Sequence, residues 1–235
     1  MSDTAIIAME IAFNLLYLTA IYILVINMYT RFRTGAGADR AIAGPFLLAF
    51  FLLAVGDTGH VGFRVAAFAF GGLEENELLV GIGALATAVT VTGFYMLMAK
   101  VQSSANDSRR AAWYWTVMIL GVIRLVFMTF PGNRWGQVVP PMLFSYIRNI
   151  FLTGMGIIVA VMLWSESKLE FRRFSRAAAV CIFISFGFYL PVILFIRSVP
   201  MLGMLMIPKT LAYVALAVIG RRRLFTAEPV VSAEG

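Results

Sequence analysis

The chain is poor in the residues that carry most metal and redox chemistry. It has one cysteine, Cys181, and one histidine, His60, among 235 residues. A single cysteine cannot form an internal disulfide or a cysteine-rich metal cluster. A single histidine cannot ligate a haem from both sides, and a zinc site would need three or four ligands. We therefore expect no metal site and no cofactor.

Charged residues are also scarce. Asp, Glu, Lys and Arg make up 13% of the chain, and 61% of the residues are hydrophobic. Soluble domains contain about 25% charged and about 45 to 50% apolar residues. This composition predicts a membrane protein. The net charge of +7 would favour nucleic acid in a soluble protein, but most Lys and Arg lie in predicted loops, so we expect no nucleic-acid partner.

Long apolar runs occupy most of the sequence. About 20 apolar residues cross the hydrocarbon core as a helix, and these runs are too long and too uniformly apolar for the strands of a membrane barrel. The sequence predicts an all-α bundle of seven transmembrane helices at residues 5–29, 42–70, 78–99, 112–130, 141–164, 177–197 and 201–220. We expect one domain, residues 1–225, and a short, disordered cytoplasmic tail, residues 226–235.

The predicted loops differ in their basic content. The segments after the first, third, fifth and seventh helices hold three, three, four and three Lys and Arg residues, 13 in all. The remaining segments hold two, Arg134 and Arg197. Because basic loops stay in the cytoplasm, we predict a multi-pass protein of the cell membrane with its N-terminus outside and its C-terminus in the cytoplasm.

Seven ionisable residues lie inside the predicted helices. They are Glu10, Asp57, His60, Arg64, Arg124, Arg148 and Lys209. A charge in hydrocarbon costs at least ~2.5 kcal/mol, so such groups usually line a cavity and pair with one another. A rise of about 1.5 Å per residue places them about 7 to 20 Å below the outer boundary. We predict that they surround one polar cavity that opens to the outside.

The charges in this predicted cavity do not balance. Three Arg and Lys209 contribute +4, and Glu10 and Asp57 contribute −2, which leaves +2 with His60 neutral. An excess of buried positive charge favours an anion, and guanidinium groups bind carboxylate or phosphate with paired hydrogen bonds. We expect a small anionic or amphiphilic ligand, in a carrier, sensor or lipid-binding protein.

We assign roles within this cavity by residue type. Arg64, Arg148 and Lys209 would contact the anion, and Asp57 and Glu10 would balance charge or relay protons. Membrane lipids are the other expected partners, and the sequence leaves the oligomeric state open.

Three of the ionisable residues share one stripe of the second helix. Asp57, His60 and Arg64 are spaced three and four residues apart, so their side chains can meet, and we expect His60 to couple Asp57 to Arg64. The same spacing pairs Lys209 with Tyr213. Beside the stripe run three glycines, Gly56, Gly59 and Gly62, which would let a neighbouring helix or a ligand approach the backbone closely.

Two prolines fall inside the last two predicted helices. Pro191 and Pro208 each remove a backbone hydrogen bond if they lie within a helix. We expect each to kink its helix, and Pro208 to expose carbonyl groups beside Lys209.

Purely structural interpretations stay open. Arg64, Arg124 and Arg148 lie close enough to the boundary for their side chains to extend to lipid headgroups. The deeper Asp57 and Lys209 could form an ion pair that only fixes helix packing.

An intramembrane enzyme that modifies lipid is an alternative from a different class of function, with Asp57 and His60 as acid and base. Nucleophilic hydrolysis would need a hydroxyl beside His60. Thr58 points away from the stripe, and Ser145 and Ser185 lie on other helices. We therefore lean against enzymatic activity.

A further alternative comes from a resemblance. Lys209 in the seventh helix, together with the segment from Phe186 through Tyr189 to Pro191 in the sixth, resembles in part the microbial rhodopsins. The resemblance implies a photoreceptor or pump with retinal bound to Lys209 as a Schiff base.

The sequence departs from that family at two places. The third helix, residues 78–99, is uncharged where the family carries an arginine and the counterion acid, and Leu205 stands where an acid is usual four residues before the lysine. Asp57 or Glu10 would then have to serve as the counterion.

Overall fold

The computed structural model describes residues 3–35, 39–105, 111–166 and 168–226. Within these ranges it contains helices and no strands, and seven of the helices are long and apolar enough to cross a membrane. They are α1 (Asp3–Arg33), α2 (Arg40–Ala69), α3 (Glu77–Ala105), α4 (Ala111–Met128), α5 (Met142–Trp164), α6 (Leu169–Phe195) and α7 (Met206–Leu224). Two short 3-10 helices, η2 (Pro131–Asn133) and η3 (Pro200–Leu205), precede α5 and α7.

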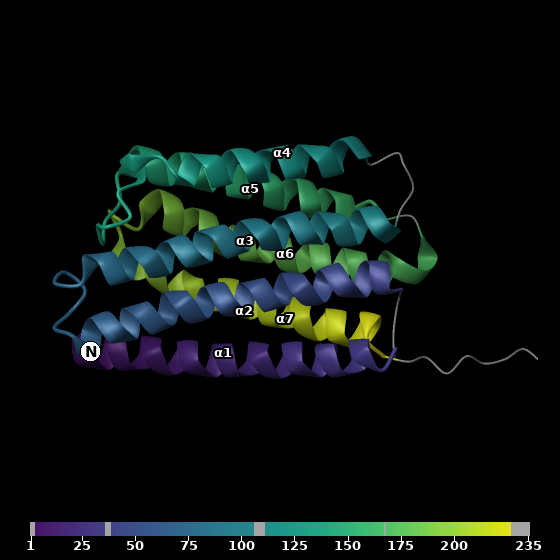
Figure 1. Cartoon of the computed structure of the whole chain (residues 1–235), viewed down its shortest axis with the longest axis horizontal. Coiled ribbons are helices and arrows are strands. Elements are labelled where there is room, and N and C mark those ends of the chain that lie inside the picture. The colour runs from purple at the N-terminus through teal and green to yellow at the C-terminus, as the bar shows by residue number, and fades with distance from the viewer. Residues whose placement is uncertain (1–2, 36–38, 106–110, 167, 227–235) are drawn as a thin grey trace, which may run out of the picture.

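The seven helices run side by side along the long axis of the molecule (Figure 1). Each packs against the next one in the chain, α7 returns to contact α1, and α3 also contacts α5. We call the end where α1 begins the N-terminal end, and it also holds the connections α2–α3, α4–α5 and α6–α7. The opposite end, where α1 and α7 finish in arginine-rich turns, is the basic end.

The predicted all-helical architecture is confirmed, but several boundaries differ from the prediction. Helix α3 ends at Ala105, six residues after the predicted end at 99, and α7 begins at Met206, five residues after the predicted start at 201. Helix α6 begins at Leu169, eight residues before the predicted start at 177. The first turns of this helix pack against α2, since the buried Phe174 ring lies 5.8 Å from the ring of Phe46. Residues 227–235 of the predicted tail lie outside the described residues.

The two prolines occupy different positions in their helices. Pro191 lies inside α6, as predicted, and the helix continues to Phe195. Pro208 is the third residue of α7, which follows η3 directly, so the helical path changes from 3-10 to α two residues before this proline. The kinks expected at the two prolines stay predictions.

Helices α2 and α3 approach one another closely through the predicted glycine stripe. A Cβ atom on Gly56 would lie 1.8 Å from Oγ1 of Thr90, and one on Gly59 would lie 3.2 Å from the Cβ of Ala86. The third glycine, Gly62, has nothing within 4 Å of such an atom. The close approach is confirmed for two of the three glycines, and the neighbour is α3.

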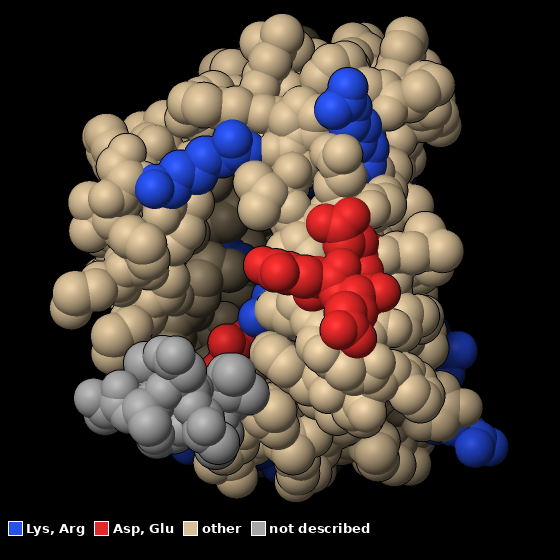
Figure 2. Space-filling model, turned by 90° about the vertical axis from the view of Figure 1, so that its left-hand side faces the viewer, with Lys and Arg blue, Asp and Glu red and all other residues tan. Residues whose placement is uncertain are grey.

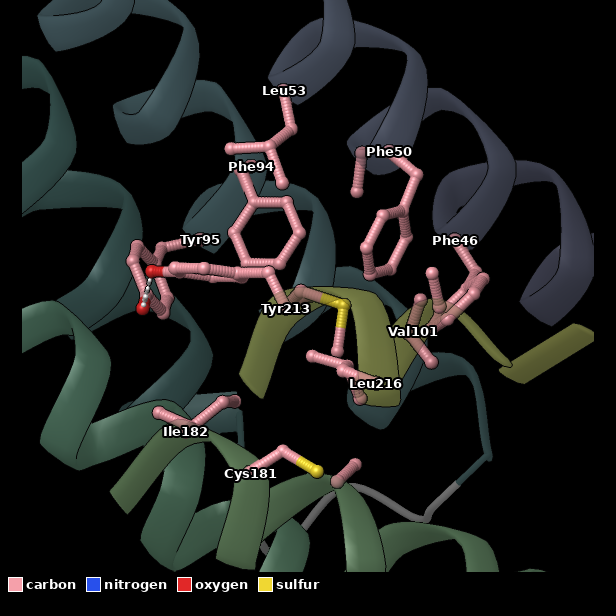
Figure 3. Packing of buried hydrophobic residues seen from close by; sticks show 14 of the residues in the cluster. Phe46, Phe50, Leu53, Phe94, Tyr95, Val101, Cys181, Ile182, Tyr213 and Leu216 are labelled. Atoms are coloured by element: carbon pink, nitrogen blue, oxygen red, sulfur yellow. Dashed lines mark hydrogen bonds between the residues drawn. The ribbon is translucent and has the colours of Figure 1, made fainter. Parts of the chain in front are cut away.

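A cluster of aromatic rings fills the centre of the bundle (Figure 3). Ring centroids lie 4.9 Å apart for Phe46 and Phe50, 5.4 Å for Phe50 and Phe94, and 5.5 Å for Phe94 and Tyr213. The hydroxyls of Tyr95 and Tyr213 are hydrogen-bonded at 2.7 Å. Phe46 and Phe50 lie in the half of α2 nearer the basic end, whereas Asp57, His60 and Arg64 lie in its other half.

Candidate functional site

The structure places all seven predicted site residues in the half of the bundle nearer the N-terminal end. Glu10 is in the first turns of α1, Arg148 and Lys209 lie near the starts of α5 and α7, and Arg124 lies near the end of α4. Asp57, His60 and Arg64 occupy the second half of α2. Figure 2 views this end of the molecule and shows a hollow with basic and acidic side-chain atoms inside it.

Asp57 is held from α1. The Tyr17 hydroxyl donates a 2.6 Å hydrogen bond to Oδ2 of Asp57. The side chain of Tyr17 is 7% exposed and Asp57 is half-buried. The carboxylate therefore occupies a fixed position in the interior of the bundle.

His60 does not bridge its neighbours on the stripe. It makes no hydrogen bond to any described residue, and its Nδ1 atom is buried without a partner in that part of the chain. The predicted coupling of Asp57 to Arg64 through His60 is therefore wrong for this structure. Asp57 bonds across to α1 instead, and so does Arg64.

Arg64 forms an ion pair with Glu10 of α1. The Nη2 to Oε1 distance is 3.0 Å, and the two side chains are 26% and 43% exposed. It is the one ion pair within the described ranges of the chain. Because the charge of Arg64 is already matched, its predicted contact with an anion is less strongly supported than that of Lys209.

Lys209 lies among aromatic rings. Its Nζ atom is 4.7 Å from the ring centroid of Tyr189 and 5.6 Å from that of Tyr213. The predicted neighbour relation with Tyr213 is thus confirmed. Asp57 is the carboxylate that interacts electrostatically with this ammonium group, but no hydrogen bond joins Lys209 to a described residue.

Arg124 ties three helices together. Its Nε donates to the carbonyl of Arg148 at 2.9 Å, and its Nη1 donates to the carbonyl of Ala88 at 2.6 Å and to the Thr92 hydroxyl. The residue is only 2% exposed. The interpretation in which its side chain extends to lipid headgroups is therefore wrong, since its donors point inward to α3 and α5.

Arg148 is held by the connection between α4 and α5. Its guanidinium carbon lies 4.2 Å from the ring centroid of Trp135, and its Nη1 donates to Oδ1 of Asn133 at 3.3 Å. Its Nε and Nη2 have no hydrogen-bond partner among the described residues. At 8% exposure the side chain is buried, oriented by Trp135, and still has donors to offer.

Tyr189 of α6 lies near these cations. Its hydroxyl donates to Oδ1 of Asn149, the residue after Arg148 in α5, at 2.9 Å. The Nζ atom of Lys209 lies over its ring. Arg124 donates to the carbonyl of Arg148. None of the three cations is in an ion pair with a described carboxylate, and we call Arg124, Arg148, Tyr189 and Lys209 the cation cluster.

Sequence reasoning missed the residues that orient these groups. Tyr17 lies seven residues after Glu10, on the same face of α1, so helical spacing could have identified it. Tyr189 was named from the sequence, but no contact with Lys209 or Asn149 was assigned to it. Trp135 and Asn133 lie in the irregular connection before α5, where no periodic pattern indicates which side chains point inward.

The described residues include no group of three or more His, Cys, Asp and Glu that could hold a metal ion. Comparison of the chain with protein-family models, curated proteins and solved structures gave no match.

Proposed function

We propose that the chain is a multi-pass protein of the cell membrane whose hollow at the N-terminal end binds a small anionic or amphiphilic ligand. In this proposal the N-terminal end faces outward and the basic end faces the cytoplasm, following the distribution of Lys and Arg. The protein would act as a carrier, a sensor or a lipid-binding protein.

The observation that supports the proposal best is the cation cluster. Arg124 and Arg148 have no carboxylate partner among the described residues, and the acid that acts on Lys209 makes its hydrogen bond to Tyr17 instead. Cations taken out of water are costly unless an opposite charge compensates them. A bound anion would supply that charge.

The surroundings of the cluster favour an amphiphile over a bare ion. The rings of Tyr189, Tyr213 and Trp135 lie beside the cations and offer apolar surface to a hydrocarbon or aromatic portion of the ligand. The unused donors of Arg148 suit two oxygens of one carboxylate or phosphate. Ligand sites commonly combine apolar walls with a few convergent polar groups.

Calorimetric titration of the full chain in nanodiscs tests this proposal. Decanoate and decyl phosphate are expected to bind, whereas decyltrimethylammonium and decyl maltoside, with the same tail, are not. Lys209→Met should weaken anion binding about tenfold, which corresponds to about 1.4 kcal/mol. The matched control is Arg173→Met, which removes an exposed charge at the basic end. Equal affinity for all four amphiphiles would overturn the proposal.

A bound retinal is the second candidate, and one observation favours it. The amine of Lys209 is free of hydrogen bonds to described residues and lies against two tyrosine rings, with Asp57 as the interacting acid. Purification with all-trans-retinal should then give a visible absorbance band that disappears in Lys209→Ala. A colourless product excludes this candidate.

The lipid-modifying enzyme remains a prediction that the geometry does not favour, because no hydrogen bond joins Asp57 to His60. Turnover of labelled lipid that is lost in His60→Ala and retained in Arg64→Lys would support it.

A further inference from the structure

A cleft between α1 and α7 lies near the basic end, far along the bundle from the hollow. These helices are in contact and lie side by side in Figure 1. The cleft has a volume of about 280 Å³ and is lined by Ile23, Leu24, Asn27, Val218, Arg221 and Arg222. Its lining therefore combines an apolar wall with two cationic side chains.

The polar part of the cleft is oriented by a bond between the two helices. The Nε atom of Arg221 donates to Oδ1 of Asn27 at 2.8 Å. The Nη1 and Nη2 atoms of Arg221 have no hydrogen-bond partner in the part of the chain that the structure describes, and neither Arg221 nor the exposed Arg222 forms an ion pair there. The free donors of a fixed guanidinium are suited to two oxygens of a phosphate.

The apolar part of the cleft lies on the membrane-spanning length of the helices. Ile23 is 62% exposed on α1, and Val218 lies one turn before Arg221 on α7. Both helices are apolar enough to cross a membrane. The wall is therefore at the depth of acyl chains, whereas the arginines occupy the last turn of α7, where the helix leaves the hydrocarbon.

We propose that this cleft binds an anionic membrane phospholipid, with its phosphate on Arg221 and Arg222 and one acyl chain along Ile23 and Val218. Basic pockets between transmembrane helices on the cytoplasmic side suit anionic lipid headgroups. Other arginines at this end, including Arg31, add attraction for a leaflet that carries negative charge. The site rests on the membrane orientation proposed above, and it is independent of the cation cluster and of the ligand proposed for the hollow.

Native mass spectrometry of the delipidated full chain in detergent tests the site. Dioleoyl phosphatidylglycerol should bind at least about tenfold more tightly than dioleoyl phosphatidylcholine. Arg221→Gln with Arg222→Gln should abolish this preference. Arg172→Gln with Arg173→Gln removes two charges from α6 at the same end and should keep it.

A second variant separates the cleft from general attraction to basic loops. Ile23→Trp changes no charge. Because Ile23 is exposed, the larger side chain can occupy the space of the acyl chain without disturbing the fold, so phosphatidylglycerol affinity should fall about tenfold. Unchanged affinity in Ile23→Trp overturns the proposal, whether or not the double arginine variant folds. Displacement of the lipid by millimolar inorganic phosphate also overturns it, because the site would then recognise phosphate without an acyl chain.

Discussion

The Tyr17 hydroxyl on α1 donates a 2.6 Å hydrogen bond to Oδ2 of Asp57 on α2. Asp57 in turn interacts electrostatically with Lys209 on α7. Helices α1, α2 and α7 thus meet at one carboxylate. The Tyr17 bond uses Oδ2 of Asp57, and no hydrogen bond joins Lys209 to a described residue.

Removing this bond should destabilise the bundle. A hydrogen bond to a charged group contributes about 1.5 to 3 kcal/mol, so Tyr17→Phe should lower the free energy of unfolding by about that amount. Reversible unfolding in mixed micelles measures the change. Tyr22→Phe is the matched control, since the exposed Tyr22 to Thr58 bond joins the same two helices and its loss should cost less than about 1 kcal/mol. Equal costs for the two variants would contradict the expectation that the bond to Asp57 stabilises the bundle more than the bond to Thr58.

Arg124 should not tolerate replacement by lysine. Its guanidinium reaches the carbonyls of Arg148 and Ala88 and the Thr92 hydroxyl at once, and a single ammonium group cannot reproduce that fork. Arg124→Lys should therefore cost about 2 to 4 kcal/mol of unfolding free energy, because each buried acceptor left without a donor costs about 1 to 3 kcal/mol. Arg64→Lys, in the partly exposed ion pair with Glu10, should cost less than about 1 kcal/mol.

The packing of α2 on α3 predicts opposite effects for two glycine substitutions. In Gly56→Ala the new methyl would meet Thr90 at 1.8 Å from its Oγ1 and 2.8 Å from its Cβ, so the helices must separate, at about 1 to 3 kcal/mol. Gly62→Ala meets nothing within 4 Å and should be neutral or stabilising by up to about 1 kcal/mol. The unfolding midpoint in a denaturing detergent titration compares the two variants.

The proposed orientation predicts which loops are accessible from outside the cell. In a Cys181→Ala background, Glu75→Cys in the connection after α2 should react with a membrane-impermeant maleimide on intact cells. Arg173→Cys at the basic end should react only after the cells are permeabilised. The reverse pattern would invert the proposed topology, and labelling of both sites on intact cells would contradict a membrane-spanning chain with a basic cytoplasmic side.

Much of the fold follows from the sequence because a run of about 20 apolar residues is expected to form one membrane-spanning helix. Helix number and class could be read from the runs, and the tight α2–α3 contact from Gly56 and Gly59. The start of α6 was misplaced because a hydropathy count begins at the apolar run, whereas α6 already begins in the more polar segment before Phe174.

The location of the candidate site residues was predictable from the sequence, and their pairing was not. Depth counting brought seven ionisable residues to one half of the bundle, but the partners of Asp57 and Arg64 lie on α1, and helical spacing within α2 does not indicate which contacts form between helices. The roles of Arg124 and Arg148 differ for a similar reason. Backbone carbonyl groups accept hydrogen bonds from Arg124, and the Trp135 ring packs against Arg148. A pattern of charges in the sequence indicates neither kind of partner.

The most direct test of the anion site is the affinity of the full chain for decyl phosphate in the double variant Lys209→Met with Arg148→Gln. These residues contribute two of the three cations of the cluster, so their joint loss should weaken binding about a hundredfold, about 2.8 kcal/mol. The folded state of the variant is checked by its unfolding midpoint. Affinity equal to that of the unaltered chain in a folded double variant would contradict the proposal that the cation cluster binds the ligand.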